Sequence, residues 1–255
     1  MSDSTHLQIR REGAVDHVVL NRPKVRNAFN EHLIADMAAW AARAAHDAEL
    51  RAAVISGTGA MFCAGADLEW MSKMAAYSQE DNIRDATAAA RMFSAWDNLP
   101  FPVIARVHGG AIGGGVGLAA VADIVVASTD AMFGFTEVKL GLLPAIIAPF
   151  VLAKIGRSAA RELFLTGRRF TADEAKQIGL VHAVVPADQL DSAVEKYLAD
   201  ILAAGREAIA ASKALIRRIC ECSPEEAQRL CVAAIAERRV SPEAQARMKA
   251  FLNRL

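Results

Sequence analysis

Two glycine-rich segments of the chain each lie between an expected strand and an expected helix. The first reads Phe-Cys-Ala-Gly-Ala-Asp-Leu (62–68), and the second reads Val-His-Gly-Gly-Ala-Ile-Gly-Gly-Gly-Val-Gly-Leu (107–118). Small residues let a ligand approach the main chain, and the free N–H groups at a helix N-terminus favour negative charge. One N–H donor from each segment would form an oxyanion hole, which stabilises the negative oxygen of an enolate.

Each segment also has a simpler explanation. Taken alone, the first is more simply a tight loop in which Asp67 caps a helix. In the second, four glycines fall in the expected first turns of a helix, where each costs about 1 kcal/mol relative to alanine. Close helix packing could account for them, and so could a ligand lying against the backbone. Neither segment has a Walker or a dinucleotide-binding pattern, and no GxSxG occurs in the chain.

Glu137 is the candidate acid–base group. A single positioned carboxylate is worth roughly 10²–10⁴-fold in rate, which is enough for measurable chemistry. On the sequence alone, Glu137 could equally be a solvated residue beside Lys139. We expect His108 to be structural at a strand end, and His182 to lie in the core or at a subunit contact.

The elements that must position these residues change character along the chain. Strands alternate with helices in the first part, which predicts an α/β fold with a buried, largely parallel sheet. Helices dominate from Ser158 onward, with one further strand expected at Leu180–Val185. We therefore expect an α/β core over residues 1–195 and a helical region over 196–255. The other expected strands are Leu7–Arg11, His17–Leu20, Ala52–Ser56, Pro102–Val107, Asp123–Ser128 and Met132–Thr136.

Composition narrows the classes of partner and the compartment. The 255 residues carry 29 Lys and Arg against 29 Asp and Glu, so there is no basic footprint for nucleic acid. The longest apolar stretch, Leu142–Ala153, contains two prolines and is too short to span a bilayer, which takes about 20 residues. Met1–Leu7 has no signal-peptide core. We expect a cytoplasmic protein without membrane or metal, whose four cysteines are reduced thiols.

The motifs together resemble the crotonase (enoyl-CoA hydratase/isomerase) superfamily over nearly the whole chain. The matching segments are Asn21–Lys24 with Asn27–Ala28, Cys63–Leu68, Gly113–Gly117, Ala122–Ile124, Phe133–Glu137, Leu140–Pro144, Leu165–Gly167 and Ala175–Val181. The resemblance implies a spiral of ββα units with a C-terminal helical trimerisation region, assembled as a homotrimer or homohexamer. It implies an acyl-CoA substrate and no separate cofactor, because coenzyme A is part of the substrate.

The resemblance also implies roles for individual residues. The oxyanion donors would be the N–H groups of Ala66 and Gly114, with Glu137 as the catalytic carboxylate. The implied substrate- and CoA-binding positions are Lys24, Arg26, Ala28, Ala64, Ala66, Asp67, Leu68, Gly113, Gly114, Pro144, Phe251 and Arg254. Phe251 and Arg254 would reach the CoA of a neighbouring subunit.

The chain departs from the family pattern at one position. Family hydratases often use a second glutamate, and Gly117 stands at that position here. Similarity to bacterial methylglutaconyl-CoA hydratases, which act in leucine breakdown, favours an enoyl-CoA hydratase. A Δ3,Δ2-enoyl-CoA isomerase, which needs one carboxylate and no water, is the main alternative, and a non-catalytic CoA-binding relative is another.

A substrate with a second carboxylate would need an arginine or a lysine to meet it. Lys73, Arg84 and Arg91 are the candidates. The acyl pocket itself could be lined by Trp70, Met71, Met74 and Tyr77, although these side chains could equally be ordinary core.

Overall fold

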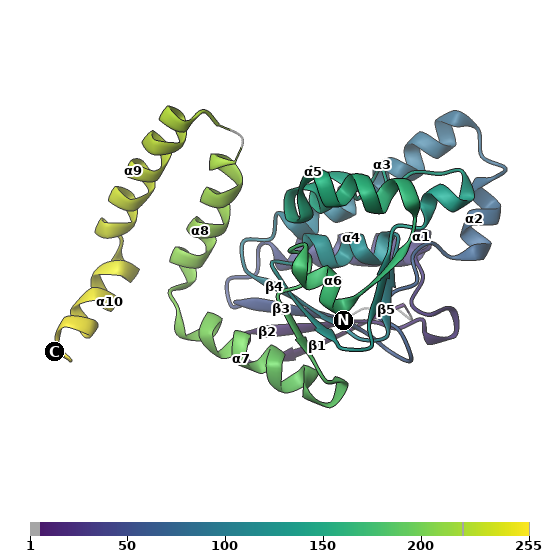
Figure 1. Cartoon of the computed structure of the whole chain (residues 1–255). Coiled ribbons are helices and arrows are strands. Elements are labelled where there is room, and N and C mark those ends of the chain that lie inside the picture. Colours follow the sequence, from purple (N-terminus) through teal and green to yellow (C-terminus); the bar gives the residue numbers. More distant parts are fainter. Residues whose placement is uncertain (1–5, 221, 255) are drawn as a thin grey trace.

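A six-stranded sheet forms the centre of the fold in the computed structural model, which describes residues 6–220 and 222–254 (Figure 1). The strand order is β1-β2-β3-β4-β6-β9, and all pairs are parallel except β1 with β2. The strands are β1 (Leu7–Glu12), β2 (Val15–Leu20), β3 (Ala52–Gly57), β4 (Val103–Val107), β6 (Ile124–Ser128) and β9 (Ala183–Val185). Parallel strands are covered on both faces, which explains their short apolar runs.

A second sheet, of three short strands, positions the glycine-rich segment against Glu137. Its strands are β5 (Gly110–Ile112), β7 (Met132–Gly134) and β8 (Arg169–Thr171), in the order β5-β7-β8. Neither β5 nor β8 was predicted from the sequence. Because β5 and β7 are parallel, their carboxyl ends meet, and the Gly113 N–H donates to the Gly134 carbonyl over 2.8 Å. The chain after β5 enters α4, and the chain after β7 leads to Glu137.

Helices cover both faces of the large sheet (Figure 1). Helices α1, α3, α4 and α5 pack on one face around the main apolar core, and α7 covers the other face over a second cluster that includes Val54 and Ile104. The bounds are α1 (Glu31–Ala44), α2 (Leu68–Met74), α3 (Gln79–Asp97), α4 (Gly114–Val121), α5 (Ala148–Thr166), α6 (Ala172–Gln177) and α7 (Leu190–Ala203), with 3-10 turns η1 (Pro23–Val25), η2 (Glu137–Leu140) and η3 (Ala187–Gln189).

Local signals in the sequence explain where several of these helices begin. The Asn30 side chain accepts a hydrogen bond from the Leu33 N–H, and the Ser78 side chain accepts one from the Asp81 N–H, as expected of N-caps. Helix α5 contains a break at Gly156, whose φ of +68° lies outside the helical region.

The C-terminal arm, made of α8 (Arg206–Ile219), α9 (Pro224–Val240) and α10 (Pro242–Leu252), stands apart from the core (Figure 1). None of these three helices contains a buried residue. Polar contacts hold α8 to the core: Lys213 Nζ lies 2.7 Å from Asp123 Oδ2 and 3.2 Å from the Phe101 carbonyl. The expected boundary after residue 195 falls inside α7, which packs on the sheet. In the part of the chain described here, no helix is both long and apolar enough to cross a membrane.

Candidate active site

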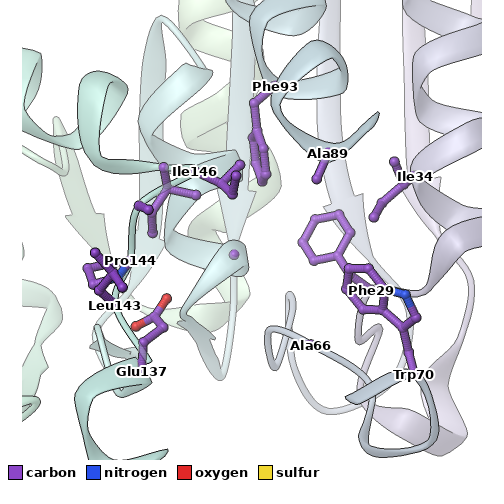
Figure 2. A pocket seen from close by; sticks show the side chains of 13 residues that line it. Phe29, Ile34, Ala66, Trp70, Ala89, Phe93, Glu137, Leu143, Pro144 and Ile146 are labelled. Carbon is purple, nitrogen blue, oxygen red and sulfur yellow. The ribbon is translucent and has the colours of Figure 1, made fainter. Parts of the chain in front are cut away.

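An apolar pocket of about 170 Å³ lies between the first glycine-rich loop and the start of α5 (Figure 2). Figure 2 shows Glu137 on one side of it, with Phe29 and Trp70 on the opposite side. The lining residues are Phe29, Ile34, Ala66, Trp70, Ala89, Phe93, Gly114, Glu137, Leu143, Pro144, Ala145, Ile146 and Ile147. Of these described lining residues, Glu137 alone has a charged side chain.

Two backbone N–H groups are free to face this pocket. The Phe29 N–H donates to the Gly65 carbonyl over 2.7 Å, and the Asp67 N–H donates to the Phe29 carbonyl over 2.8 Å. Because N–H directions alternate along an extended chain, the Ala66 N–H points away from Phe29. Gly114 is the first residue of α4, where an N–H has no acceptor within the helix. Both residues line the pocket, so a ligand oxygen could accept from both amides.

The surroundings of the Glu137 carboxyl group are unusual for a charged side chain. Its Oε2 atom is buried and has no hydrogen-bond partner among the described residues. Burial raises the pKa of the Glu137 carboxyl, and a hydrogen bond from its own backbone N–H offsets part of that rise. A Cβ atom added at Gly113, which has φ +52°, would lie 3.1 Å from Oε1, so glycine there leaves the carboxyl group its room.

The glycines of the second segment serve two purposes. Gly113 and Gly114 lie beside Glu137 and the pocket, whereas Gly115 and Gly117 permit close packing. A Cβ at Gly115 would be 2.5 Å from the Cys63 carbonyl oxygen, and a Cβ at Gly117 would be 2.2 Å from Ile147 Cγ2 and 3.0 Å from Phe93 Cε1. Apolar side chains therefore occupy the space at the position where family hydratases often have a second glutamate. Close packing therefore explains Gly115 and Gly117, whereas a ligand lying against the backbone stays a prediction for Gly113 and Gly114.

We expect Gly117→Ala to lower the free energy of unfolding by about 1–3 kcal/mol, because the new methyl group overpacks against Ile147. Without that clash, alanine in place of glycine inside a helix would raise the free energy of unfolding by about 1 kcal/mol. The sign of the measured change therefore shows whether the clash occurs. Urea denaturation measures the effect. The double variant with Ile147→Ala should recover part of the loss, and strictly additive effects would contradict the packing argument.

The structure brings some of the predicted binding residues together and leaves others outside the pocket. Ala66, Gly114, Glu137 and Pro144 line the pocket, and Gly113 adjoins Glu137. The predicted residues outside the pocket lining are Lys24, Arg26, Ala28, Ala64, Asp67, Leu68, Phe251 and Arg254. Lys24, Arg26 and Leu68 are exposed near the first loop, so they remain accessible to a ligand.

Asp67 has a structural partner that sequence reasoning did not identify. Its Oδ2 atom accepts from Arg22 Nη2 over 2.7 Å, and its Oδ1 atom accepts from the Glu69 N–H over 2.8 Å as the cap of α2. Arg22 Nη1 also donates to the Ala28 carbonyl. Arg22 therefore ties the first loop together, and the signal for it was its place in the motif Asn21–Lys24.

The remaining predicted residues line the pocket, make structural contacts or lie away from the pocket. Trp70 lines the pocket and Met74 packs against the core. His108 Nε2 lies 2.9 Å from the Gly59 carbonyl, and His182 Nδ1 accepts from the Val125 N–H, so both are structural. Phe251 lies on α10, on the far side of the molecule from α2, and Arg254 follows it (Figure 1). The pocket walls Phe29, Phe93 and Ile147 were not predicted, because they come from three distant segments.

Comparisons with known proteins identify the family of the chain. The sequence model of the family described as "Enoyl-CoA hydratase/isomerase" matches residues 10–255. The chain belongs to the enoyl-CoA hydratase/isomerase family. The resemblance to the crotonase superfamily is thereby confirmed, and so is the expected spiral fold.

Two relatives and one solved structure illustrate the range of the enoyl-CoA hydratase/isomerase family. A short-chain-enoyl-CoA hydratase of Clostridium acetobutylicum is 33% identical over 221 residues, which is 86% of this chain and 84% of that protein. A human mitochondrial Delta(3,5)-Delta(2,4)-dienoyl-CoA isomerase is 40% identical over 190 residues, 70% of this chain and 58% of that protein. The crystal structure of an enoyl-CoA hydratase from Shewanella pealeana matches 98% of this chain and 94% of its own, with 34% identity and a TM-score of 0.94.

Proposed function

We propose that the protein is an enoyl-CoA hydratase, which adds water across the 2,3-double bond of an acyl-CoA thioester. The thioester oxygen would accept hydrogen bonds from the Ala66 and Gly114 amides, which stabilise the enolate that forms during the reaction. The observation that carries the proposal is the single carboxyl group of Glu137, whose Oε2 atom has no partner among the described residues, in the same pocket as these two donors.

In this mechanism Glu137 performs both proton transfers. The carboxylate accepts a proton from water as the water oxygen bonds to C3, and the π electrons move into the thioester as an enolate. The protonated carboxyl group then gives its proton to C2, and the enolate collapses to the thioester. The carboxyl group ends in its starting form, and the net change is the addition of one water molecule. The raised pKa of Glu137 suits this exchange, since a group that both takes and gives a proton works best near the ambient pH.

A second candidate is a Δ3,Δ2-enoyl-CoA isomerase. Its carboxylate would take a proton from C2 of a 3-enoyl thioester and return it to C4, with no water. Two observations favour it: Ile147 and Phe93 fill the space beside Gly117, and no second carboxylate lines the pocket among the described residues. The similarity to an isomerase also supports this alternative.

The substrate, assembly and compartment complete the proposal. The resemblance suggests 3-methylglutaconyl-CoA or a related branched chain, and the short-chain hydratase among the relatives supports a small acyl group. The exposed Lys24, Arg26 and Leu68 are the proposed CoA contacts near the pocket.

The apolar surface of the C-terminal arm suits association into a homotrimer or homohexamer, in which Phe251 and Arg254 would approach a neighbouring subunit's CoA. We propose no cofactor beyond the CoA of the substrate. The free thiols of Cys63, Cys220 and Cys231 suit the cytoplasm.

Mass analysis after incubation with crotonyl-CoA, 3-methylglutaconyl-CoA and a 3-enoyl-CoA tests the proposal. A hydratase adds the mass of one water to the first or the second compound. An isomerase leaves the mass of the 3-enoyl-CoA unchanged while its double bond becomes conjugated to the thioester, which raises the ultraviolet absorbance. Conjugation of the 3-enoyl-CoA with no hydration of the other compounds would replace the hydratase assignment with the isomerase.

The pH dependence of the reaction should report the raised pKa of Glu137. The free enzyme needs the carboxylate form, so kcat/KM for hydration is lost as the pH falls through the pKa of this group. Because burial raises that pKa, the loss should occur above 4.5, the ordinary value for glutamate. A profile from about pH 4 to pH 8 checks this expectation. An acid limb at or below 4.5 would mean that another group is the base.

A further inference from the structure

The side of the pocket opposite Glu137 is formed by α1, α2 and α3. Ile34, Trp70 and Ala89 contribute to it, and Figure 2 shows all three on the side of the cavity opposite Glu137. An acyl chain whose thioester oxygen sits between the Ala66 and Gly114 amides would extend along this apolar surface. Its chain end would therefore meet whatever charges stand behind these three residues.

No cation is available at this side of the pocket. The lining set contains no lysine, arginine or histidine among the residues that the structure describes. Lys73 on α2 lies 3.0 Å from Glu31 Oε1 and 3.6 Å from Glu69 Oε1, so two carboxylates already neutralise it. Arg84 is paired with Asp81 on the exposed face of α3. Arg91, also on α3, is exposed and is not one of the lining residues. A carboxylate at the end of the acyl chain would therefore meet no positive side chain in the described lining of the pocket.

Two acidic side chains, Asp85 and Glu31, lie behind this side of the pocket. The Trp70 indole nitrogen is buried and lies near the Asp85 carboxyl group, without the geometry of a full hydrogen bond. Burial raises the pKa of Asp85, contact with the Trp70 indole offsets part of that rise, and the charge of Glu31 adds to it. Glu31 has a buried oxygen, Oε2, with no hydrogen-bond partner in the described part of the chain. A hydrogen bond from its own backbone N–H and the contact with Lys73 lower the pKa of Glu31, so this group is ionised. A negative charge here disfavours a second carboxylate, on the ligand, nearby.

The size of the pocket limits the length of the chain. An apolar cavity of about 150 Å³ holds a benzene molecule, so the 170 Å³ here suits a group of about six carbons or fewer. Ile147 and Phe93 block extension towards Gly117, where even a methyl group would collide.

We propose that the pocket selects short, uncharged acyl chains of about four to six carbons and discriminates against a chain that ends in a carboxylate. This inference rests on the proposed function, because it assumes that an acyl-CoA thioester occupies the pocket. Of the branched substrates considered above, it favours an uncharged one over 3-methylglutaconyl-CoA.

Binding of two saturated thioesters tests the inference without depending on catalysis. Pentanoyl-CoA and glutaryl-CoA have acyl chains of equal carbon number, and only the second ends in a carboxylate. Isothermal titration calorimetry should give a Kd at least about tenfold lower for pentanoyl-CoA, which corresponds to about 1.4 kcal/mol. Decanoyl-CoA should bind no tighter than hexanoyl-CoA.

The outcomes separate the selectivity from the function. Glutaryl-CoA binding as tightly as pentanoyl-CoA would overturn the discrimination against charge, and tighter binding of decanoyl-CoA would overturn the length limit. If pentanoyl-CoA is preferred but no enoyl-CoA is hydrated or isomerised, the selectivity stands and the catalytic proposal fails. If neither CoA nor any thioester binds, the proposed function and this inference fail together.

A matched pair of variants tests the electrostatic cause. Asp85→Asn removes the carboxyl group behind Trp70 and should narrow the preference for pentanoyl-CoA severalfold. Asp200→Asn makes the same chemical change on the exposed surface of α7, away from the pocket, and should leave the preference unchanged. Glu31→Gln provides a second test should Asp85→Asn fold poorly. An unchanged preference in both Asp85→Asn and Glu31→Gln would contradict a role for the acidic groups.

Discussion

Glu137→Gln is expected to lower kcat by roughly 10²–10⁴-fold while leaving the affinity for a saturated acyl-CoA nearly unchanged. Glutamine has almost the same shape as glutamate but cannot accept and return a proton. The Glu137 carboxyl group is the only charged group among the described lining residues, so no neighbour can take over its work. Steady-state rates with crotonyl-CoA, together with calorimetry of a saturated thioester, would separate the two effects.

Two further measurements belong with this experiment: the thermal stability of the Glu137→Gln variant and the activity of a control variant substituted away from the pocket. Because Glu137 is half-buried and its buried Oε2 atom has no partner among the described residues, the glutamine variant should unfold at a temperature equal to or above that of the parent protein. Glu195→Gln, on the exposed surface of α7, makes the same substitution away from the pocket and should keep full activity. Full activity in Glu137→Gln would show that another group transfers the protons.

Gly114→Pro is expected to lower kcat by about 10²–10³-fold, because it deletes one of the two N–H donors. Gly114 is the first residue of α4, where proline is well tolerated, so the helix itself should survive. The loss should appear in kcat far more than in the affinity for a saturated thioester, since the donor acts mainly on the charge of the enolate.

Gly114→Ala is the matched control for the proline variant. Its Cβ would lie 3.2 Å from the Phe29 ring, so it tests the added bulk while keeping the N–H group. We expect a clearly smaller loss for alanine than for proline. Equal losses would indicate that contact with Phe29, and not the missing donor, determines the effect. Circular dichroism and thermal unfolding of both variants would exclude a general loss of structure.

Short-range features of the sequence predicted many of the helices and strands. Asn30 and Ser78 cap helices because their side chains can bond to nearby free N–H groups, which depends only on neighbouring residues. Runs of apolar residues predicted the buried parallel strands at about the right places. The strands β5 and β8 escaped prediction, because three residues carry no periodic pattern and become strands only by pairing with β7.

By itself, the sequence determined the family, the two backbone sites and the one candidate carboxylate, because those features depend on residue type and order. Only the tertiary structure decided how they combine. Pairing of β5 with β7 brings the start of α4 to Glu137, and burial there raises the pKa of its carboxyl group. The same folding packs Ile147 and Phe93 against Gly117 and places acidic groups behind Trp70. These contacts join residues far apart in the chain, and a sequence pattern does not encode the distances between them.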